Sequence, residues 1–395
     1  MKNKDYTMFG LPLAALLIGL ISPPAGAAPA GKLVAWGNNA YGQTNVPAGN
    51  DFVAIDASQG GHALALRSDG SLVGWGWNYG DPVLGTGDIF YGQAIVPAGN
   101  DFKAIAAGAF HSLALKTNGS LVGWGSNTGP DGTFAGQATV PAGNDFVAIA
   151  AGDFHSLALK TDGSVVAWGD NSVGQTNVPA GNDFVAITAG DGYNLALRSD
   201  GSLVAWGEDN VGQVSNVPSG NDFVAIAGGW GQSLVLKTDG SLVGWGWNIN
   251  GQATPPAGTN FVASAAGWRH SLALKTDGSL VGWGWNYGDG GSGTAGTFYG
   301  QATPPAGTNF LAISAGFEYS LAIQMGPPKI LSPGFNVGLF GFNLTGPPGH
   351  SVIVETSTDL ASWLPIWTNT FAPDLHFSDP QSGVYSHRFY RARVP

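Results

Sequence analysis

The sequence contains no cysteine, and only 10% of its 395 residues are charged. Without cysteine, the chain can form no disulfide framework, no thiolate nucleophile and no cysteine metal site. Its 15 Lys and Arg residues are outnumbered by 26 Asp and Glu residues, which gives a formal net charge of −11. Because phosphate binding needs clustered Lys and Arg, this balance disfavours nucleic acid and anionic membranes as partners.

Glycine and tryptophan are abundant instead, with 63 and 14 copies. Disordered chains lack the aromatic residues that build a core. A β architecture with many tight turns and little helix accommodates both residue types. The chain is also long enough for one large domain and a small one.

The N-terminus has the organisation of a secretory signal. Lys2 and Lys4 precede an apolar run from Met8 to Ile21, which ends before the small-residue site Ala25-Gly26-Ala27. This run is too short to span a bilayer comfortably. We therefore expect residues 1–28 to be a cleaved signal peptide and the mature protein to be extracytoplasmic: periplasmic, secreted or on the cell surface. An uncleaved N-terminal anchor is the alternative.

Internal repeats organise the rest of the chain. A Trp-Gly pair begins at Trp36, Trp75, Trp124, Trp168, Trp206, Trp245 and Trp283, and a Gly-Gln pair begins at Gly42, Gly92, Gly136, Gly174, Gly212, Gly251 and Gly300. Short apolar runs bounded by Gly, Pro and Asp lie between the pairs, as is typical of buried strands joined by tight turns. Units of about 42 residues, each with about four short strands, indicate the blades of a β-propeller.

The two ends of the repeat region give the number of blades. Seven units run from Gly-Gln to the second apolar strand, and the last finishes at Ile323, but only six continue to a Trp-Gly strand. The missing copy is the segment from Gly31 to Gly37. We expect it to complete the last blade and close the ring, which removes an exposed sheet edge.

The predicted architecture is therefore all-β, with two parts. A seven-bladed propeller occupies residues 31–324, and a linker over 325–333 leads to a small C-terminal β module over 334–395. In that module the sequence predicts strands at 340–344, 351–356, 364–370 and 387–394.

The repeat resembles a known family. The motifs Trp-Gly-x-Asn…Gly-Gln and Ala-Gly-x-x-His-Ser-Leu-Ala-Leu are similar to the regulator-of-chromosome-condensation repeat, in seven copies over nearly three quarters of the chain. Within that family, the short Gly-Gln-x-x-x-Val-Pro form and the signal peptide resemble the secreted bacterial β-lactamase-inhibitor propeller more than the nuclear exchange factor. The C-terminal stretch Glu355 to Trp363, with Phe389-Tyr390-Arg391, is similar to a small β module at the ends of exported bacterial proteins.

No catalytic or metal-binding constellation is apparent, so we expect neither an enzyme nor a cofactor. His62, His111, His155 and His270 share one repeat position, which Tyr193, Gln232 and Tyr319 fill in the other blades. These substitutions would remove ligands from a ring of metal-binding histidines. We therefore expect these side chains to form hydrogen bonds with the backbone at the start of their strands. Calcium binding by the Gly-rich loops is an alternative without a recognised motif; these loops carry Asp81, Asp88, Asp131 and Asp289.

The positions at which the repeats disagree are the predicted binding site. The two residues between Ala-Gly and the histidine position vary from blade to blade, yet aromatic residues recur among them. In the inhibitor-type propellers that the sequence resembles, residues of this loop contact the enzyme. We therefore predict a binding face made of Phe110, Phe154, Tyr193, Trp230, Trp268 and Phe317. The alternative is that these side chains plug the central channel.

Three classes of function remain open. The first is an exported protein-binding propeller, with inhibition of a β-lactamase-like enzyme as its narrower version. The second is a carbohydrate-binding or cell-surface adhesion protein, whose aromatic side chains stack on sugars. The third is guanine nucleotide exchange, against which the export signal argues.

Overall fold

The computed structural model describes residues 30–80, 89–288, 296–326, 329–336, 339–345, 351–370, 375–382, 384–385 and 387–393. The predicted signal peptide and the loop acids Asp81, Asp88 and Asp289 lie outside these ranges. Over the part of the chain that is described, no helix is long and apolar enough to cross a membrane.

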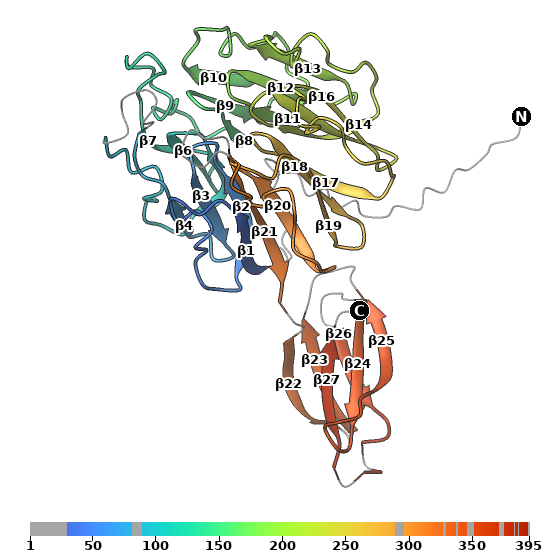
Figure 1. Ribbon diagram of the computed structural model, residues 1–395. Coiled ribbons are helices and arrows are strands. Elements are labelled where there is room, and N and C mark those ends of the chain that lie inside the picture. The colour runs from blue at the N-terminus through green and yellow to red at the C-terminus, as the bar shows by residue number, and fades with distance from the viewer. Residues whose placement is uncertain are drawn as a thin grey trace, which may run out of the picture.

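The propeller is a ring of three-stranded antiparallel blades (Figure 1), and the pairing of Gly31 with Phe52 joins the seventh and first blades into one sheet. The first two blades are β2 (Phe52–Ala57), β3 (His62–Arg67) and β4 (Leu72–Gly76), then β5 (Phe102–Ala107), β6 (His111–Lys116) and β7 (Leu121–Gly125). The third and fourth are β8 (Phe146–Ala151), β9 (His155–Lys160) and β10 (Val165–Gly169), then β11 (Phe184–Ala189), β12 (Tyr193–Arg198) and β13 (Leu203–Gly207). The fifth and sixth are β14 (Phe223–Gly228), β15 (Gln232–Lys237) and β16 (Leu242–Gly246), then β17 (Phe261–Ala266), β18 (His270–Lys275) and β19 (Leu280–Gly284).

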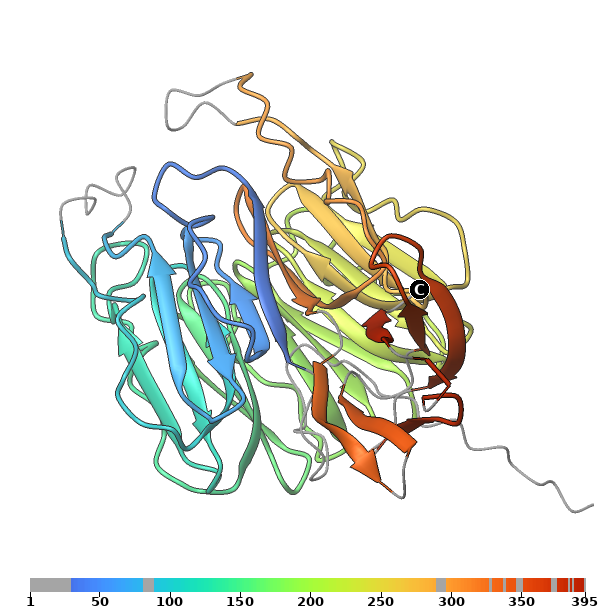
Figure 2. The ribbon, with the colours of Figure 1, turned by 90° about the horizontal axis from the view of Figure 1, so that it is seen from below.

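The seventh blade joins the two ends of the propeller chain. It consists of β20 (Phe310–Ala315), β21 (Tyr319–Met325) and β1 (Gly31–Gly37). β1 pairs with β21 in a continuous register from Gly31 opposite Met325 to Gly37 opposite Tyr319. The blue strand β1 accordingly lies beside the orange β20 and β21 in both views (Figures 1 and 2). The predicted ring closure by residues 31–37 is confirmed.

Each blade has three strands, not the four that the repeat length suggested. The segment from Gly-Gln to Pro-Ala-Gly, such as residues 42–49, forms turns and unpaired extended chain. Its proline has no N–H to donate to a ladder. The segment is held instead by the repeated tryptophan of each third strand, whose Nε1 donates to the Gln carbonyl: Trp36 to Gln301, Trp75 to Gln43, Trp124 to Gln93, Trp168 to Gln137, Trp206 to Gln175, Trp245 to Gln213 and Trp283 to Gln252, at 2.8–3.0 Å.

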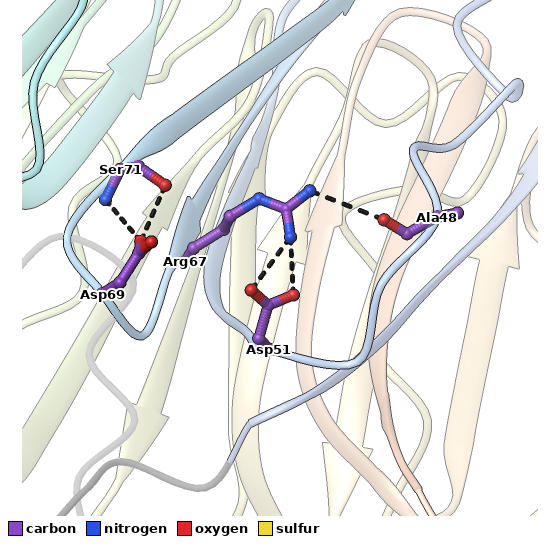
Figure 3. A network of polar contacts seen from close by, with 5 residues as sticks. All are labelled: Ala48, Asp51, Arg67, Asp69 and Ser71. Atoms are coloured by element: carbon purple, nitrogen blue, oxygen red, sulfur yellow. Dashed lines mark hydrogen bonds and ion pairs between the residues drawn. The ribbon is translucent and has the colours of Figure 1, made fainter.

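The ring has two different ends. We call "loop face" the end that carries the variable residues before the histidine position and the loops after Trp-Gly. The opposite end, with the Thr-Asp-Gly-Ser turns and their counterparts, is the "hairpin face". On the hairpin face Arg67 donates to both carboxylate oxygens of Asp51, at 2.7 and 2.9 Å, while Asp69 accepts from Ser71 in the turn (Figure 3). Met325 and Gly31 also lie at this end, so the C-terminal module is joined to the propeller there.

The C-terminal module consists of two three-stranded sheets, drawn below the propeller in Figure 1. One contains β22 (Lys329–Asn336), β23 (Leu339–Thr345) and β26 (Leu375–Asp379), and the other β24 (Ser351–Ser357), β25 (Leu364–Thr370) and β27 (Phe389–Arg393). Its own core includes Phe342, Val352, Val354 and Phe377. β22 begins inside the segment expected to be a linker, and the sequence pattern predicted neither β22 nor β26.

Candidate functional site

A belt of hydrogen bonds between blades lies directly beneath the loop face. His62, at the start of β3, bonds through Nε2 to Ser112 Oγ of the next blade at 2.8 Å. Ser112 Oγ donates in turn to the Gln93 carbonyl, so the histidine is the donor and its neutral Nε2–H tautomer is the one present. The same bond recurs from His111 to Ser156, from His155 to Asn194 and from His270 to Ser320, at 2.7–2.8 Å.

The other three blades complete the belt with different side chains. Tyr193 OH donates to the Gln232 carbonyl at 2.6 Å, and Gln232 Nε2 donates to the Gly267 carbonyl at 2.8 Å. Tyr319 OH donates to the His62 carbonyl, in the blade where Ala63 replaces the usual serine. The longer tyrosine side chain thus reaches the backbone of the next blade, and Tyr193 OH also lies 2.9 Å from Ser233 Oγ. We expected these side chains to bond backbone at the start of their strands. Tyr193, Gln232 and Tyr319 do bond backbone, but that of the neighbouring blade, and the four histidines bond a side chain of the neighbouring blade instead.

Close packing at the belt requires the preceding glycine. A Cβ on Gly152 would lie 2.3 Å from His155 Cε1 and 2.5 Å from the Gly190 carbonyl oxygen of the next blade. Burial lowers the pKa of the histidines, to about 3 for His62 and about 4 for His155. The histidines are therefore neutral at pH 7, as their role as donors between the blades requires.

Two of the predicted binding residues meet across blades. The rings of Phe110 and Phe154 lie 5.4 Å apart, and Tyr91 packs edge-on against Phe110 at 6.4 Å. Together with the loop 128–132 they line a hollow on the loop face, which we call the phenylalanine hollow. Phe154 is half-buried, whereas Phe110 is largely buried at 9% exposure and forms part of the wall.

Three further predicted residues form a second cluster, the tryptophan ladder. Trp268 stacks on Phe317 with ring centroids 4.3 Å apart, and Trp230 contacts Trp247 at 4.9 Å. The Arg269 guanidinium lies over both Trp268 and Trp247, at 3.7 and 5.2 Å from the ring centroids. These rings thus pack on one another and on an internal cation.

Tyr193 does not belong to the exposed face. Its side chain is fully buried at 0% exposure, and its hydroxyl is part of the belt. It occupies the histidine position of its blade, one residue deeper than the variable pair, so the prediction that it contacts a partner is corrected.

Several aromatic side chains outside the predicted set also lie on the loop face. Tyr41, Trp77, Tyr79 and Phe90 form a chain of ring contacts of 4.0–5.4 Å, and Phe90 is 56% exposed. A similar chain joins Trp285, Tyr287 and Phe298. Tyr41 lies in the short loop after the first Trp-Gly, and the other residues of both chains lie in the two longest loops, which follow Trp75 and Trp283. In the three long loops, and in none of the short ones, a Phe stands two residues before the Gly-Gln pair, at positions 90, 134 and 298. This difference between the repeats could have pointed to the aromatic loops.

Acidic side chains occupy the loop face between the two clusters. Asp191 and Glu208 lie in the fourth blade, and burial raises the pKa of both carboxyl groups. The proximity of Asp191 raises the pKa of Glu208 further, while a hydrogen bond from Asp153 partly offsets the effect on Asp191. Asp170 follows the third Trp-Gly, and its backbone N–H donates to the Phe154 carbonyl at 2.9 Å.

The central channel is lined by the innermost strands rather than by the aromatic residues. Its walls are mainly the Ile, Ala and Ser side chains of these strands, with Asp56 and Gln59 from the first blade. Asp56 accepts from the Ala107 N–H at 2.8 Å and from Ser314 Oγ at 3.2 Å. Burial raises the pKa of Asp56 to about 6. None of the six predicted residues lines this channel, which does not support the alternative that they plug it.

In the described residues, no group of three His, Asp or Glu side chains is placed to hold a metal ion. Of the loop acids considered for calcium, Asp131 is described, and its Oδ1 accepts from Thr133 N and Oγ1 at 2.9 and 2.6 Å. Asp131 thus closes its own turn.

The model of the regulator of chromosome condensation (RCC1) repeat matches residues 102–129, 146–175, 184–213, 223–252 and 262–290. These segments contain the strands and belt residues of the second to sixth blades. The ring is an RCC1-type β-propeller. Comparison with curated proteins finds no match.

Several solved structures have a similar fold. Prp20p from Saccharomyces cerevisiae matches with a TM-score of 0.60 and 19% identity, over 78% of this chain and 94% of that one. Human WBSCR16 matches with a TM-score of 0.57 and 18% identity, over 76% and 99%. The ectodomain of the Physcomitrella patens receptor kinase CR4 matches with a TM-score of 0.52 and 20% identity, over 73% and 81%. At these identities the likeness concerns the fold.

Proposed function

We propose that this protein is an exported, non-enzymatic RCC1-type propeller that binds a protein partner through its loop face. The observation that carries the proposal is the contrast between repeated and variable positions. The belt and its tryptophans recur in every blade, whereas the loop face above them carries a different set of large aromatic and acidic side chains in each sector. Aromatic side chains on rigidly held loops supply contact area at a low cost in conformational entropy.

Similar propellers support a protein as the class of partner. The structure of Prp20p is described together with its binding to Gsp1p and histones, and another yeast structure contains Kap60 bound to the same propeller. Nucleotide exchange itself is not proposed for this chain, because the predicted signal peptide would remove it from a cytosolic GTPase.

The test is capture from the native envelope fraction with the mature protein. We expect a specific protein to be retained by the wild type and identified by mass spectrometry. It should be lost on the triple variant Phe154→Ala, Trp230→Ala and Phe317→Ala. The control is Asp162→Asn on the hairpin face, since Asn118 makes the same turn bonds in the second blade. Retention of the protein by the triple variant would contradict the proposal.

A narrower version is inhibition of a secreted or periplasmic enzyme, after the resemblance to the β-lactamase inhibitor. Nanomolar inhibition of any class A β-lactamase by the mature protein would support it. Absence of inhibition across a panel would remove it and leave the binding proposal in place.

Carbohydrate binding is the second candidate, and the observation that favours it is the phenylalanine hollow with its three aromatic rings. A glycan array probed with the wild type and with the Phe154→Gly variant of the hollow tests it. An array without any bound glycan counts against this candidate.

A further inference from the structure

We propose that the phenylalanine hollow and the acidic residues beside it dock a protein segment that carries a bulky apolar side chain next to an Arg or Lys. The inference rests on the proposed protein-binding function and adds the place and the chemistry of the contact. It uses the sector of the loop face formed by the second, third and fourth blades.

The hollow is a formed depression, because the loop beside it is internally fixed. Thr128 and Phe134 form an isolated antiparallel bridge, and Gly129 N–H donates to the Thr133 carbonyl at 2.7 Å. Tyr91, Phe110 and Phe154 supply the aromatic side of the lining. An apolar side chain placed there would bury its surface against these three rings.

The hollow is a poorer site for a sugar. Besides Tyr91, its polar side chains are Thr128 and Asp131, and Asp131 Oδ1 already accepts two bonds from Thr133. A sugar ring needs several free donors and acceptors beside the aromatic face, because each buried hydroxyl without a partner weakens binding. The lining thus favours an apolar side chain over a carbohydrate.

The positions of the charged residues on the propeller indicate which group the partner should carry next to its apolar side chain. The propeller has nine Lys and Arg residues between 31 and 324. Lys32, Arg67, Lys103, Lys116, Lys160, Arg198, Lys237 and Lys275 lie toward the hairpin face, at or next to the strand ends that adjoin it. The remaining one, Arg269, lies within the tryptophan ladder.

The acidic residues beside the hollow therefore lie on the loop face, where the one Lys or Arg of the propeller is Arg269. Arg269 belongs to the tryptophan ladder and not to the sector of the hollow. The Asp170 N–H donates to the Phe154 carbonyl at 2.9 Å, Asp191 follows in the next blade, and the Glu208 N–H donates to the carbonyl of Gly192, the neighbour of Asp191, at 3.0 Å. An Arg or Lys of the partner would gain charge complementarity chiefly with Asp191 and Glu208, because the Asp170 carboxylate already accepts from Ser172 Oγ and Gln175 Nε2.

The test is a selection of phage-displayed, disulfide-constrained random peptides on the mature full-length protein. We expect the enriched peptides to carry an aromatic or large aliphatic residue within three positions of an Arg or Lys. A synthetic copy of the most enriched peptide is then titrated by calorimetry against the wild type and three variants.

The repeats themselves supply substitutions that the fold accepts. Phe154→Gly copies Gly192 and Gly231, Asp191→Ala copies Ala109, and Glu208→Ser copies Ser126. We expect Phe154→Gly to weaken the peptide at least tenfold. The double variant Asp191→Ala, Glu208→Ser should weaken it about tenfold and remove most of its dependence on salt between 50 and 500 mM NaCl. The hairpin-face control Asp162→Asn should bind as the wild type does.

The inference is overturned if no peptide is enriched, if the enriched peptides lack basic residues, or if the acidic double variant binds unchanged. A glycan that binds the wild type and is lost on Phe154→Gly would also overturn it, by giving the hollow to a sugar. If the envelope capture succeeds through the loop-face aromatics while any of these results is obtained, the protein-binding function stands and only the docking chemistry is wrong.

Discussion

At the residue scale, the belt and the channel contain buried titratable groups that give the stability of the propeller opposite dependences on pH. The belt histidines are buried as neutral donors, so protonation costs folding energy, whereas Asp56 in the channel is buried as a carboxyl whose ionised form is disfavoured. Acid therefore destabilises the propeller through the histidines, and a rise in pH destabilises it through Asp56.

The histidine effect is testable with His111→Gln, which copies Gln232 of the fifth blade. Burial lowers the pKa of His111 to about 3, below its usual value near 6.5. The stability that depends on the neutral histidine is present above pH 6.5 and is lost as the pH falls toward 3. Relative to the wild type, the variant should gain about 2 kcal/mol in unfolding free energy between pH 7.5 and pH 5. Urea unfolding at the two pH values measures this gain, and an equal difference at both would contradict it.

Asp56→Ser should show the opposite pH dependence. Ser314 occupies the equivalent position of the seventh blade, where its hydroxyl accepts from the Ala57 N–H at 2.9 Å. Because the folded state raises the pKa of Asp56, the wild type loses stability as the pH rises from about 4 to 6. The variant should therefore gain about 1–3 kcal/mol over the wild type between pH 4 and pH 7.5. The same urea series with Asp162→Asn as control should show no such trend.

At the element scale, β1 is the strand that makes the ring continuous. Leu33 on this strand is buried in a core cluster with Leu321 and Ile323 of β21. Without β1, the edge of β21 and this apolar surface would be exposed.

A chain that begins at Asn38 should therefore fail to unfold cooperatively, whereas a chain that begins at Ala30 should unfold with the transition of the mature protein. Thermal denaturation followed by circular dichroism compares the two. A sharp transition for the shorter chain at an unchanged midpoint would show that the ring does not depend on β1.

The elements also show what a single sequence can reveal. Blade number and ring closure were predictable because seven copies of one pattern make the missing strand visible at residues 31–37. The three-stranded blade was not, because the Gly-Gln segment is held by indole and hydroxyl bonds to a carbonyl, and an apolar sequence pattern does not distinguish such a segment from a fourth strand. β22 and β26 lack repeats for comparison. The aromatic clusters of the site join residues that are about 40 positions apart, and Tyr193 was misplaced because its aromatic ring belongs to the belt.

At the scale of the whole molecule, the propeller and the C-terminal module have separate cores and are joined at the hairpin face. The loop face lies at the other end of the ring. Binding through it should thus be independent of the module.

Removal of residues 327–395 should leave the propeller folded, with an unchanged affinity for a loop-face ligand. Scanning calorimetry of the full and shortened chains should show the propeller transition in both. A shortened chain that binds at least tenfold more weakly, while its unfolding transition is retained, would show that the module contributes to the site.

The belt has one more consequence, which concerns how such a surface can change over generations. Because the bonds that hold blade to blade lie one residue below the variable pair, a substitution in that pair leaves the joints intact. Asp153-Phe154 and Trp230-Gly231 are two such pairs on equivalent frames. A new specificity can therefore arise by exchanging pairs or duplicating whole blades, much as antibody loops diversify on a constant framework.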